Sequence, residues 1–400
     1  MSIHVRAAGR LLDYAGSVSS EPLKTLRAWL VIGSLTLLAL SFCSPATWVE
    51  SVYCRGLFPW IQNGLVSLTG LVPWPLTFSV LVSLPIVLPL LAFVRWRRGR
   101  RQGVARLSLL WAGWLRSARV LLYTAAAFLL LWGFGYGRVP VEDRWQLSER
   151  ELSYADVRDV GRRLLSILHR DAPKSGEVLD EARAWAAIAA AEQELVGELE
   201  GWSPALPAFI KFPPPGALMF FGINGVCYPF TLEANVDPAL PSPLRLAISG
   251  HELAHVLGYC GEADANLVSF VAGLRANDAF ARYSTALQMI RYAMAGPSRP
   301  DNLWLHAHLP KRALQDLEDL RQSRRRYTSA AAANIATSIN DAYLKTQGVE
   351  LGTDDYERGF RLFVQAYLKG MVAMPRAFEP DASAAVGGES AKEPVAPSRK

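Results

Sequence analysis

The longest uncharged stretch of the chain is the feature that most constrains its fold. Between Gly56 and Val94, 39 consecutive residues include no Asp, Glu, Lys or Arg. About 20 apolar helical residues cross a hydrocarbon core of about 30 Å, so this stretch is too long for one membrane span. Prolines at 59, 73, 75, 85 and 89 also interrupt it. We therefore expect an interfacial or re-entrant segment around Leu57–Leu71 and a membrane span at about residues 76–94.

Two further apolar stretches predict two more spans. The 22 residues from Ala28 to Val49 carry no charge, which predicts a first span at about residues 28–49. A third is expected at about residues 120–136, where Trp132 and Tyr136 suit the membrane interface. Residues 1–137 thus form a predicted membrane region with three helices and the lipid bilayer as a partner.

Charge along the chain predicts the orientation. The segment between the second and third predicted spans holds eight arginines and no acidic residue. Such a segment stays in the cytoplasm, so the chain after residue 137 is expected on the extracytoplasmic side of the cytoplasmic (inner) membrane, in a multi-pass arrangement. Residues 138–400 carry 29 Lys and Arg against 33 Asp and Glu, so this part is net acidic and no nucleic-acid partner is expected.

The segment Ser249–Gly261 points most directly to chemistry. His251 and His255 are four residues apart, so on a helix both imidazoles project from one face and can bind one zinc ion, Zn2+. Glu252, beside the first histidine, can then act as a general base on a water that the metal activates. This pattern predicts a zinc-dependent peptidase acting on a peptide or protein.

Two carboxylates compete for the position of third ligand. Glu262 follows the turn at Gly258–Gly261 and would face the metal from the start of the next helix. Asp264 is the alternative ligand. Asn266 lies one turn beyond Glu262 and is expected to hold a ligand in place.

A short sheet is predicted directly before the metal-binding helix. Residues 217–236 are rich in aromatic and β-branched residues, and Asn224-Gly225 is typical of a hairpin turn. Phe230–Val236 is predicted as an edge strand that holds an extended substrate by β-addition. The substrate-binding candidates on it are Phe230, Thr231, Glu233, Ala234 and Asn235.

Helical periodicity covers most of the remaining chain. We expect helices at about 154–169, 176–199, 243–257, 262–276, 280–295, 311–325, 330–345 and 355–370. The predicted fold is therefore mostly α: three transmembrane helices followed by a zincin-like α+β catalytic domain at 138–378, with a small sheet. Residues 379–400 are expected to be a disordered tail.

Several side chains keep open roles at this stage. Cys227 and Cys260 flank the candidate site and could form a disulfide or remain free thiols. Tyr228, Tyr343 and Tyr356 are alternative candidates for stabilising an oxyanion, and the sequence does not rank them.

These motifs together resemble a known family. Gly225-Val-Cys-Tyr-Pro-Phe-Thr-Leu-Glu-Ala-Asn-Val, His251-Glu-Leu-Ala-His and Glu262-Ala-Asp-Ala-Asn are similar to the bacterial three-span, zincin-like membrane proteins catalogued as a domain of unknown function. The resemblance implies a gluzincin-type zinc metallopeptidase, with zinc as cofactor and Glu262 as the third ligand. Asp264 stands where the family commonly has a second Glu.

A membrane-anchored zinc metallopeptidase is the function that these observations favour. The alternative is a non-catalytic, zinc-stabilised membrane scaffold or sensor. Glu252 argues against that alternative, because a structural zinc site needs four protein ligands and no base.

Overall fold

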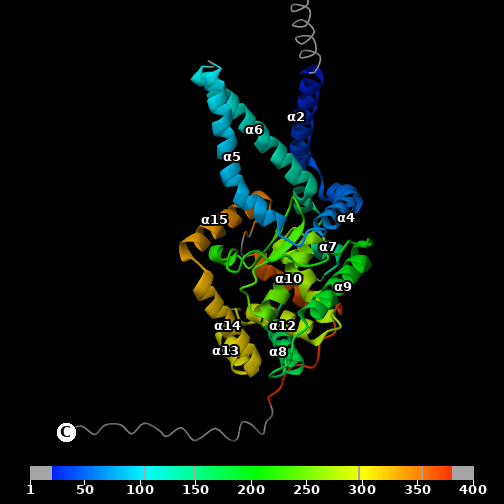
Figure 1. Cartoon of the computed structure of the whole chain (residues 1–400). Coiled ribbons are helices and arrows are strands. Elements are labelled where there is room, and N and C mark those ends of the chain that lie inside the picture. Colours follow the sequence, from blue (N-terminus) through cyan, green and yellow to red (C-terminus); the bar gives the residue numbers. More distant parts are fainter. Residues whose placement is uncertain are drawn as a thin grey trace, which may run out of the picture.

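The computed structural model describes residues 20–380 except 103–104, 148–149, 296–297, 351 and 353–354. Within these residues the chain is mostly helical, with a single two-stranded sheet. Three long helices project from one end of a globular body, which contains the remaining elements (Figure 1). Residues 381–400 of the predicted tail lie outside the described residues.

The three projecting helices are the membrane-span candidates. They are α2 (Ser20–Cys43), α5 (Leu76–Arg101) and α6 (Arg106–Leu131). Each contains a segment long and apolar enough to cross a membrane, and few of the residues in these segments are buried. Exposed apolar helices of this length suggest a membrane protein. The predicted number of spans therefore agrees with the structure.

The bounds of all three spans differ from those predicted. The second helix begins at Leu76 as expected but continues to Arg101 instead of ending near residue 94. The first helix ends at Cys43, just before Pro45, instead of continuing to residue 49. The third begins at Arg106 rather than near residue 120, so Arg116 and Arg119 lie on α6 and not in a connecting loop. The spans were predicted from uncharged stretches, which end at the first arginine. Arginine is a good helix former, so the helix itself can continue beyond that residue.

The segment predicted as interfacial or re-entrant packs on the globular body. The short helix α3 (Ala46–Trp48) leads into the π-helix η1 (Val49–Leu57), and α4 (Phe58–Thr69) follows. The Gln62 side-chain amide donates to the carbonyl oxygen of Ala205 at 2.7 Å. The Phe58 ring meets Trp202 edge-on, with the ring centroids 6.4 Å apart. This part of the expected membrane region therefore shares one hydrophobic core with residues after 138.

The body is built around α10 (Ser242–Val256), which packs against its neighbours on all sides. Small side chains at Ala247, Ser249 and Ala254 let other helices approach closely. Gly250 is needed for this packing, because a Cβ there would lie 3.2 Å from Ile188. The other body elements are η2 (Gly133–Gly137), α7 (Val141–Arg144), α8 (Tyr154–Asp171), α9 (Glu181–Glu200), η3 (Met219–Phe221), α11 (Glu262–Arg275), α12 (Ala279–Met294), α13 (Arg299–Ala307), α14 (Lys311–Tyr327), α15 (Ala330–Thr346) and α16 (Asp355–Leu368).

The sheet is a hairpin whose turn lies later than predicted. Strand β1 (Gly225–Tyr228) pairs antiparallel with β2 (Glu233–Val236). The connection therefore runs through residues 229–232, with Leu232 in the left-handed region at φ 47°. Asn224 directly precedes the first strand and Gly225 begins it, so this dipeptide is not the hairpin turn. Lys211 bridges to Asn235 on the other side of β2. The prediction that Phe230–Val236 is the edge strand is thus wrong, because β2 has backbone partners on both sides.

Glu192, on α9 behind α10, is a fully buried acid. Neither carboxyl oxygen has a hydrogen-bond partner among the described residues, and burial raises its pKa well above the ordinary value. The folded state therefore keeps the proton at a pH where the unfolded chain, with a pKa near 4.5, releases it. As pH rises above that value, wild type loses about 1.4 kcal/mol of unfolding free energy per pH unit, until the folded pKa is reached.

Glu192→Gln removes this titration. We expect its melting temperature in detergent to exceed that of wild type, and the difference to widen between about pH 5 and pH 8. Thermal unfolding across this pH range measures the effect. A constant difference at all pH values would contradict the assignment of a protonated Glu192.

Candidate metal centre

Three predicted metal ligands come together at the base of a cleft. His251 and His255 lie on successive turns of α10, and Glu262 begins α11 after the Gly258–Gly261 turn. Their ligand atoms all lie within 4.8 Å of one another. Glu262 Oε2 is 3.1 Å from His251 Nε2 and 3.3 Å from His255 Nε2. This arrangement can hold one metal ion.

Hydrogen bonds to the outer ring nitrogens orient both histidines. His251 Nδ1 is 2.9 Å from Asn266 Oδ1, and His255 Nδ1 is 2.7 Å from the carbonyl oxygen of Tyr259. Both partners are acceptors, so each Nδ1 carries the proton and donates. In the neutral form of each ring, Nε2 therefore carries the lone pair that a metal requires, and the predicted supporting role of Asn266 agrees with this geometry.

The structure separates the two candidate carboxylates. Asp264 Oδ2 lies 3.4 Å from the Arg144 guanidinium, on the side of α11 away from the histidines. Asp264 is not part of the ligand cluster, and burial raises its pKa. The geometry therefore favours Glu262 over the alternative ligand.

The charges of the cluster are strongly coupled. Burial alone would lower the pKa of His255, but the Glu262 carboxylate outweighs burial and raises it to about 9. Burial acts on Glu262 in the opposite sense, and the two imidazoles nevertheless hold its pKa far below the ordinary value. The cluster thus keeps a carboxylate charged in a buried place, which requires a positive charge beside it.

Glu252 faces the same cleft from α10 and touches strand β1. It is 4% exposed, and burial raises its pKa to about 7 although the nearby histidines lower it. The backbone N–H of Cys227 donates to its carboxylate. Gly225 leaves room for this carboxylate, because a Cβ at that position would lie 2.6 Å from Glu252 Oε1. A carboxyl group with a pKa near neutrality is suited to accepting and returning a proton.

The cleft has a volume of about 880 Å³. One wall consists of Phe128 at the end of α6 together with Trp132 and Tyr136, which follow that helix. Strand β1 forms a second wall, and residues of α12, α14 and α15 complete the lining. The Tyr136 and Tyr343 hydroxyl oxygens are 3.1 Å apart and join the first wall to α15. The third membrane-span candidate therefore ends at the candidate site.

Most of the predicted substrate residues do not reach this cleft. Phe230 lines it, but Glu233, Ala234 and Asn235 are buried in β2. The Glu233 carboxylate pairs with Lys211 and accepts a hydrogen bond from the Thr77 backbone N–H at 2.8 Å. Thr231 also donates to Glu233, at 3.1 Å. The prediction for these residues is corrected, because Thr231 and Glu233 fix the start of α5 to the sheet, Ala234 and Asn235 are buried, and β1 is the strand that faces the cleft.

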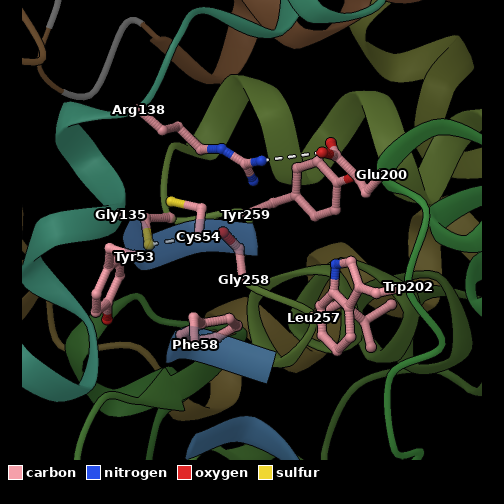
Figure 2. A pocket seen from close by; sticks show the side chains of 11 residues that line it. Tyr53, Cys54, Phe58, Gly135, Arg138, Glu200, Trp202, Leu257, Gly258 and Tyr259 are labelled. Atoms are coloured by element: carbon pink, nitrogen blue, oxygen red, sulfur yellow. Dashed lines mark hydrogen bonds and ion pairs between the residues drawn. The ribbon is translucent and has the colours of Figure 1, made fainter. Parts of the chain in front are cut away.

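A buried ionic network supports the turn after the metal-binding helix. Arg138, just after η2, donates to Glu50 of η1 and to Glu200 of α9. The Tyr259 hydroxyl donates to Glu200 at 3.0 Å. Figure 2 shows the ion pair between Arg138 and Glu200 beside the Tyr259 ring. This network links the segments that follow α2 and α6 to Tyr259, whose carbonyl oxygen orients His255.

Some residues near the cleft were left without a definite role by the sequence analysis. Tyr228 and Tyr343 both line the cleft, whereas the Tyr356 side chain lies outside the part that the structure describes. Cys227 and Cys260 are free thiols and form no disulfide. Arg291, Tyr292 and Arg324 also line the cleft, and the sequence analysis did not identify them. Periodicity predicts where their helices begin and end, but it does not show which side chains face a common cleft.

Fold and site define a mostly helical protein with three helices suited to crossing a membrane and a His-His-Glu cluster in a cleft beside them. The chain belongs to the family described as Protein of unknown function (DUF3810), whose model matches residues 53–364. No curated protein and no solved structure matches the chain. The resemblance to a family of unknown function is confirmed, and the zincin-like fold and peptidase activity that it implied stay predictions.

Proposed function

We propose that this protein is a membrane-anchored zinc metallopeptidase, a hydrolase of peptide bonds. The observation that carries the proposal is the convergence of His251 Nε2, His255 Nε2 and a Glu262 oxygen within 4.8 Å, beside Glu252 in an open cleft. Two imidazoles and one carboxylate are a frequent ligand set of catalytic zinc, and they leave a coordination position for water.

The donor set fits zinc on two further counts. The two Nδ1 atoms are engaged by oxygen acceptors, which is the usual support of zinc-binding histidines. Glu262 is held as a carboxylate and compensates part of the charge of a divalent ion. His251, His255 and Glu262 would hold the metal.

Each protein group has a part in the proposed hydrolysis. Bound zinc would lower the pKa of a water molecule and polarise the carbonyl of the scissile peptide bond. Glu252 accepts the proton of the attacking water and passes it to the nitrogen of the leaving amine, so the peptide bond breaks without a free hydroxide or amide anion. Strand β1 offers its edge to an extended substrate.

The three helices anchor this site at a membrane. We place the body on the extracytoplasmic side of the bacterial cytoplasmic membrane, because the arginines near the junction of α5 and α6 lie at the opposite ends of these helices from the body. Single cysteines introduced near residue 103 and on α14, probed with a membrane-impermeant thiol reagent in intact cells, test this orientation. We expect labelling of the cysteine on α14 only. Labelling of the cysteine near residue 103 only would show the opposite orientation.

Hydrolysis by the purified full-length chain tests the activity. With one equivalent of zinc in detergent, we expect cleavage of a subset of a broad peptide library, with chelation abolishing it and zinc restoring it. Mass spectrometry identifies the products. A zinc-loaded, folded protein that cleaves no peptide would refute the proposal.

Gly225→Ala is expected to reduce hydrolysis without loss of zinc. The new methyl group would meet the Glu252 carboxylate and the Ile248 side chain, so Glu252 has to move away from its position in the cleft. We expect a fall in kcat of about 10- to 100-fold, since displacement of a catalytic group by about 1 Å can cost 100-fold. Gly64→Ala is the control, because nothing lies within 4 Å of its added Cβ. Unchanged kcat in Gly225→Ala would argue against the role of Glu252.

A further inference from the structure

Two arginines face the cleft without an acidic partner. Arg291 belongs to α12 and Arg324 to α14, and both line the cleft that contains the His-His-Glu cluster. None of the acidic side chains that the structure describes forms an ion pair with either guanidinium. After burial, the positive charge of Arg324 is the largest influence that lowers the pKa of Arg291. Two like charges are thus held near each other, an arrangement that an anion would stabilise.

A chain of hydrogen bonds connects Arg291 to the metal ligands. Arg291 Nη1 donates to Gln288 Oε1 at 2.5 Å. The side-chain amides of Gln288 and Asn266 both hydrogen-bond to the Tyr292 hydroxyl, and Asn266 in turn accepts from His251. Arg291 is therefore held by Gln288, which is linked through Tyr292 to Asn266, the side chain that orients His251.

The other charges of the cleft restrict what the pair can bind. Its acidic lining residues are Glu252 and Glu262, and both belong to the candidate metal centre. The remainder of the lining near α15 is neutral, with Thr337 and Asn340. An anionic group of the substrate would therefore be attracted to the arginines, whose planar donors match a carboxylate.

We propose that Arg291 and Arg324 form a subsite that binds a carboxylate of the peptide substrate, either at its C-terminus or on an acidic side chain. This inference rests on the proposed peptidase function and adds a substrate class to it. The subsite would fix the register of the peptide, so that a bond at a set distance from the carboxylate lies beside Glu252.

Binding to zinc-loaded Glu252→Gln protein tests the subsite without turnover. Three peptides of one length and otherwise equal sequence are compared by calorimetry: a free C-terminal acid without acidic side chains, its C-terminal amide, and the amide with one glutamate. We expect at least one carboxylate-bearing peptide to bind about 10- to 100-fold more tightly than the neutral amide. Which of the two does so identifies the source of the carboxylate.

Variants on the Glu252→Gln background assign the effect to the arginines. Arg291→Gln and Arg324→Gln should each remove most of the preference while leaving the affinity for the neutral amide unchanged. Arg325→Gln, a neighbour on α14 that does not line the cleft, should retain it. Arg291→Lys should retain part of it, because the charge remains and the planar pair of donors is lost.

The outcomes separate this inference from the proposed function. The subsite would be overturned if the three peptides bound with equal affinity or if none of them bound. It would also be overturned if the arginine variants lost affinity equally for all three peptides. Parallel assays with Glu252 intact measure hydrolysis. Carboxylate-dependent binding without hydrolysis would refute the peptidase proposal alone, and hydrolysis without carboxylate dependence would refute the subsite alone.

Discussion

Glu252→Gln should abolish hydrolysis while zinc remains bound. The amide has nearly the shape of the carboxyl group and can still accept the Cys227 backbone N–H, so the local packing is retained. It cannot accept a proton from water, and loss of a general base costs about 100- to 10,000-fold in rate. Peptide hydrolysis and zinc content of the same preparation are the measurements.

The matched control is Glu194→Gln, an exposed glutamate on α9. It should keep wild-type activity, because the same chemical change is made far from the cleft lining. Equal activity of Glu252→Gln and wild type would exclude Glu252 as the base. Simultaneous loss of zinc and of thermal stability would instead assign Glu252 a structural role.

Removing the third ligand should have the next largest effect. In Glu262→Gln the side chain loses the charge that faces both imidazoles, so we expect zinc affinity to fall by at least about 100-fold, given that a change in a residue that merely orients a ligand costs 10- to 100-fold. Competition with a chromogenic chelator measures the affinity, and hydrolysis at limiting zinc should fall in parallel.

Asp264→Asn distinguishes the two carboxylates that the sequence left open. Asp264 faces Arg144 rather than the histidines, so this variant should keep its zinc affinity even where its thermal stability is reduced. Loss of zinc in Asp264→Asn with retention in Glu262→Gln would reverse the assignment of the ligand.

Local sequence patterns were sufficient to place the ligand cluster. The spacing of His251 and His255, the glycines at 258 and 261, and Glu262 at the start of the next helix are all local features. Each acts through backbone geometry over one or two turns, so α10 and α11 begin and end within one residue of their predicted bounds. The structure brings these three side chains together, and their metal remains a prediction.

Features that depend on distant partners were not predictable in this way. The segment that contains β2 has aromatic and β-branched residues typical of a strand, but they do not show that Lys211 lies along its second side. Arg291 and Arg324 line one cleft only because α12 and α14 both border it. Periodicity reports which face of a helix is apolar, and it carries no information on which other helix that face will meet.

The shared core of the body and its anchor limits how this protein can change. Because η1 and α4 contribute Tyr53 and Phe58 to the interior, and Arg138 bonds to Glu200, no single cut between anchor and body leaves both with intact packing. A protein in which the anchor is merely a tether can lose it by one deletion and become secreted. Here the same deletion would expose apolar surface and leave the largely buried Arg138 side chain without Glu50, so release from the bilayer would require a redesigned interior.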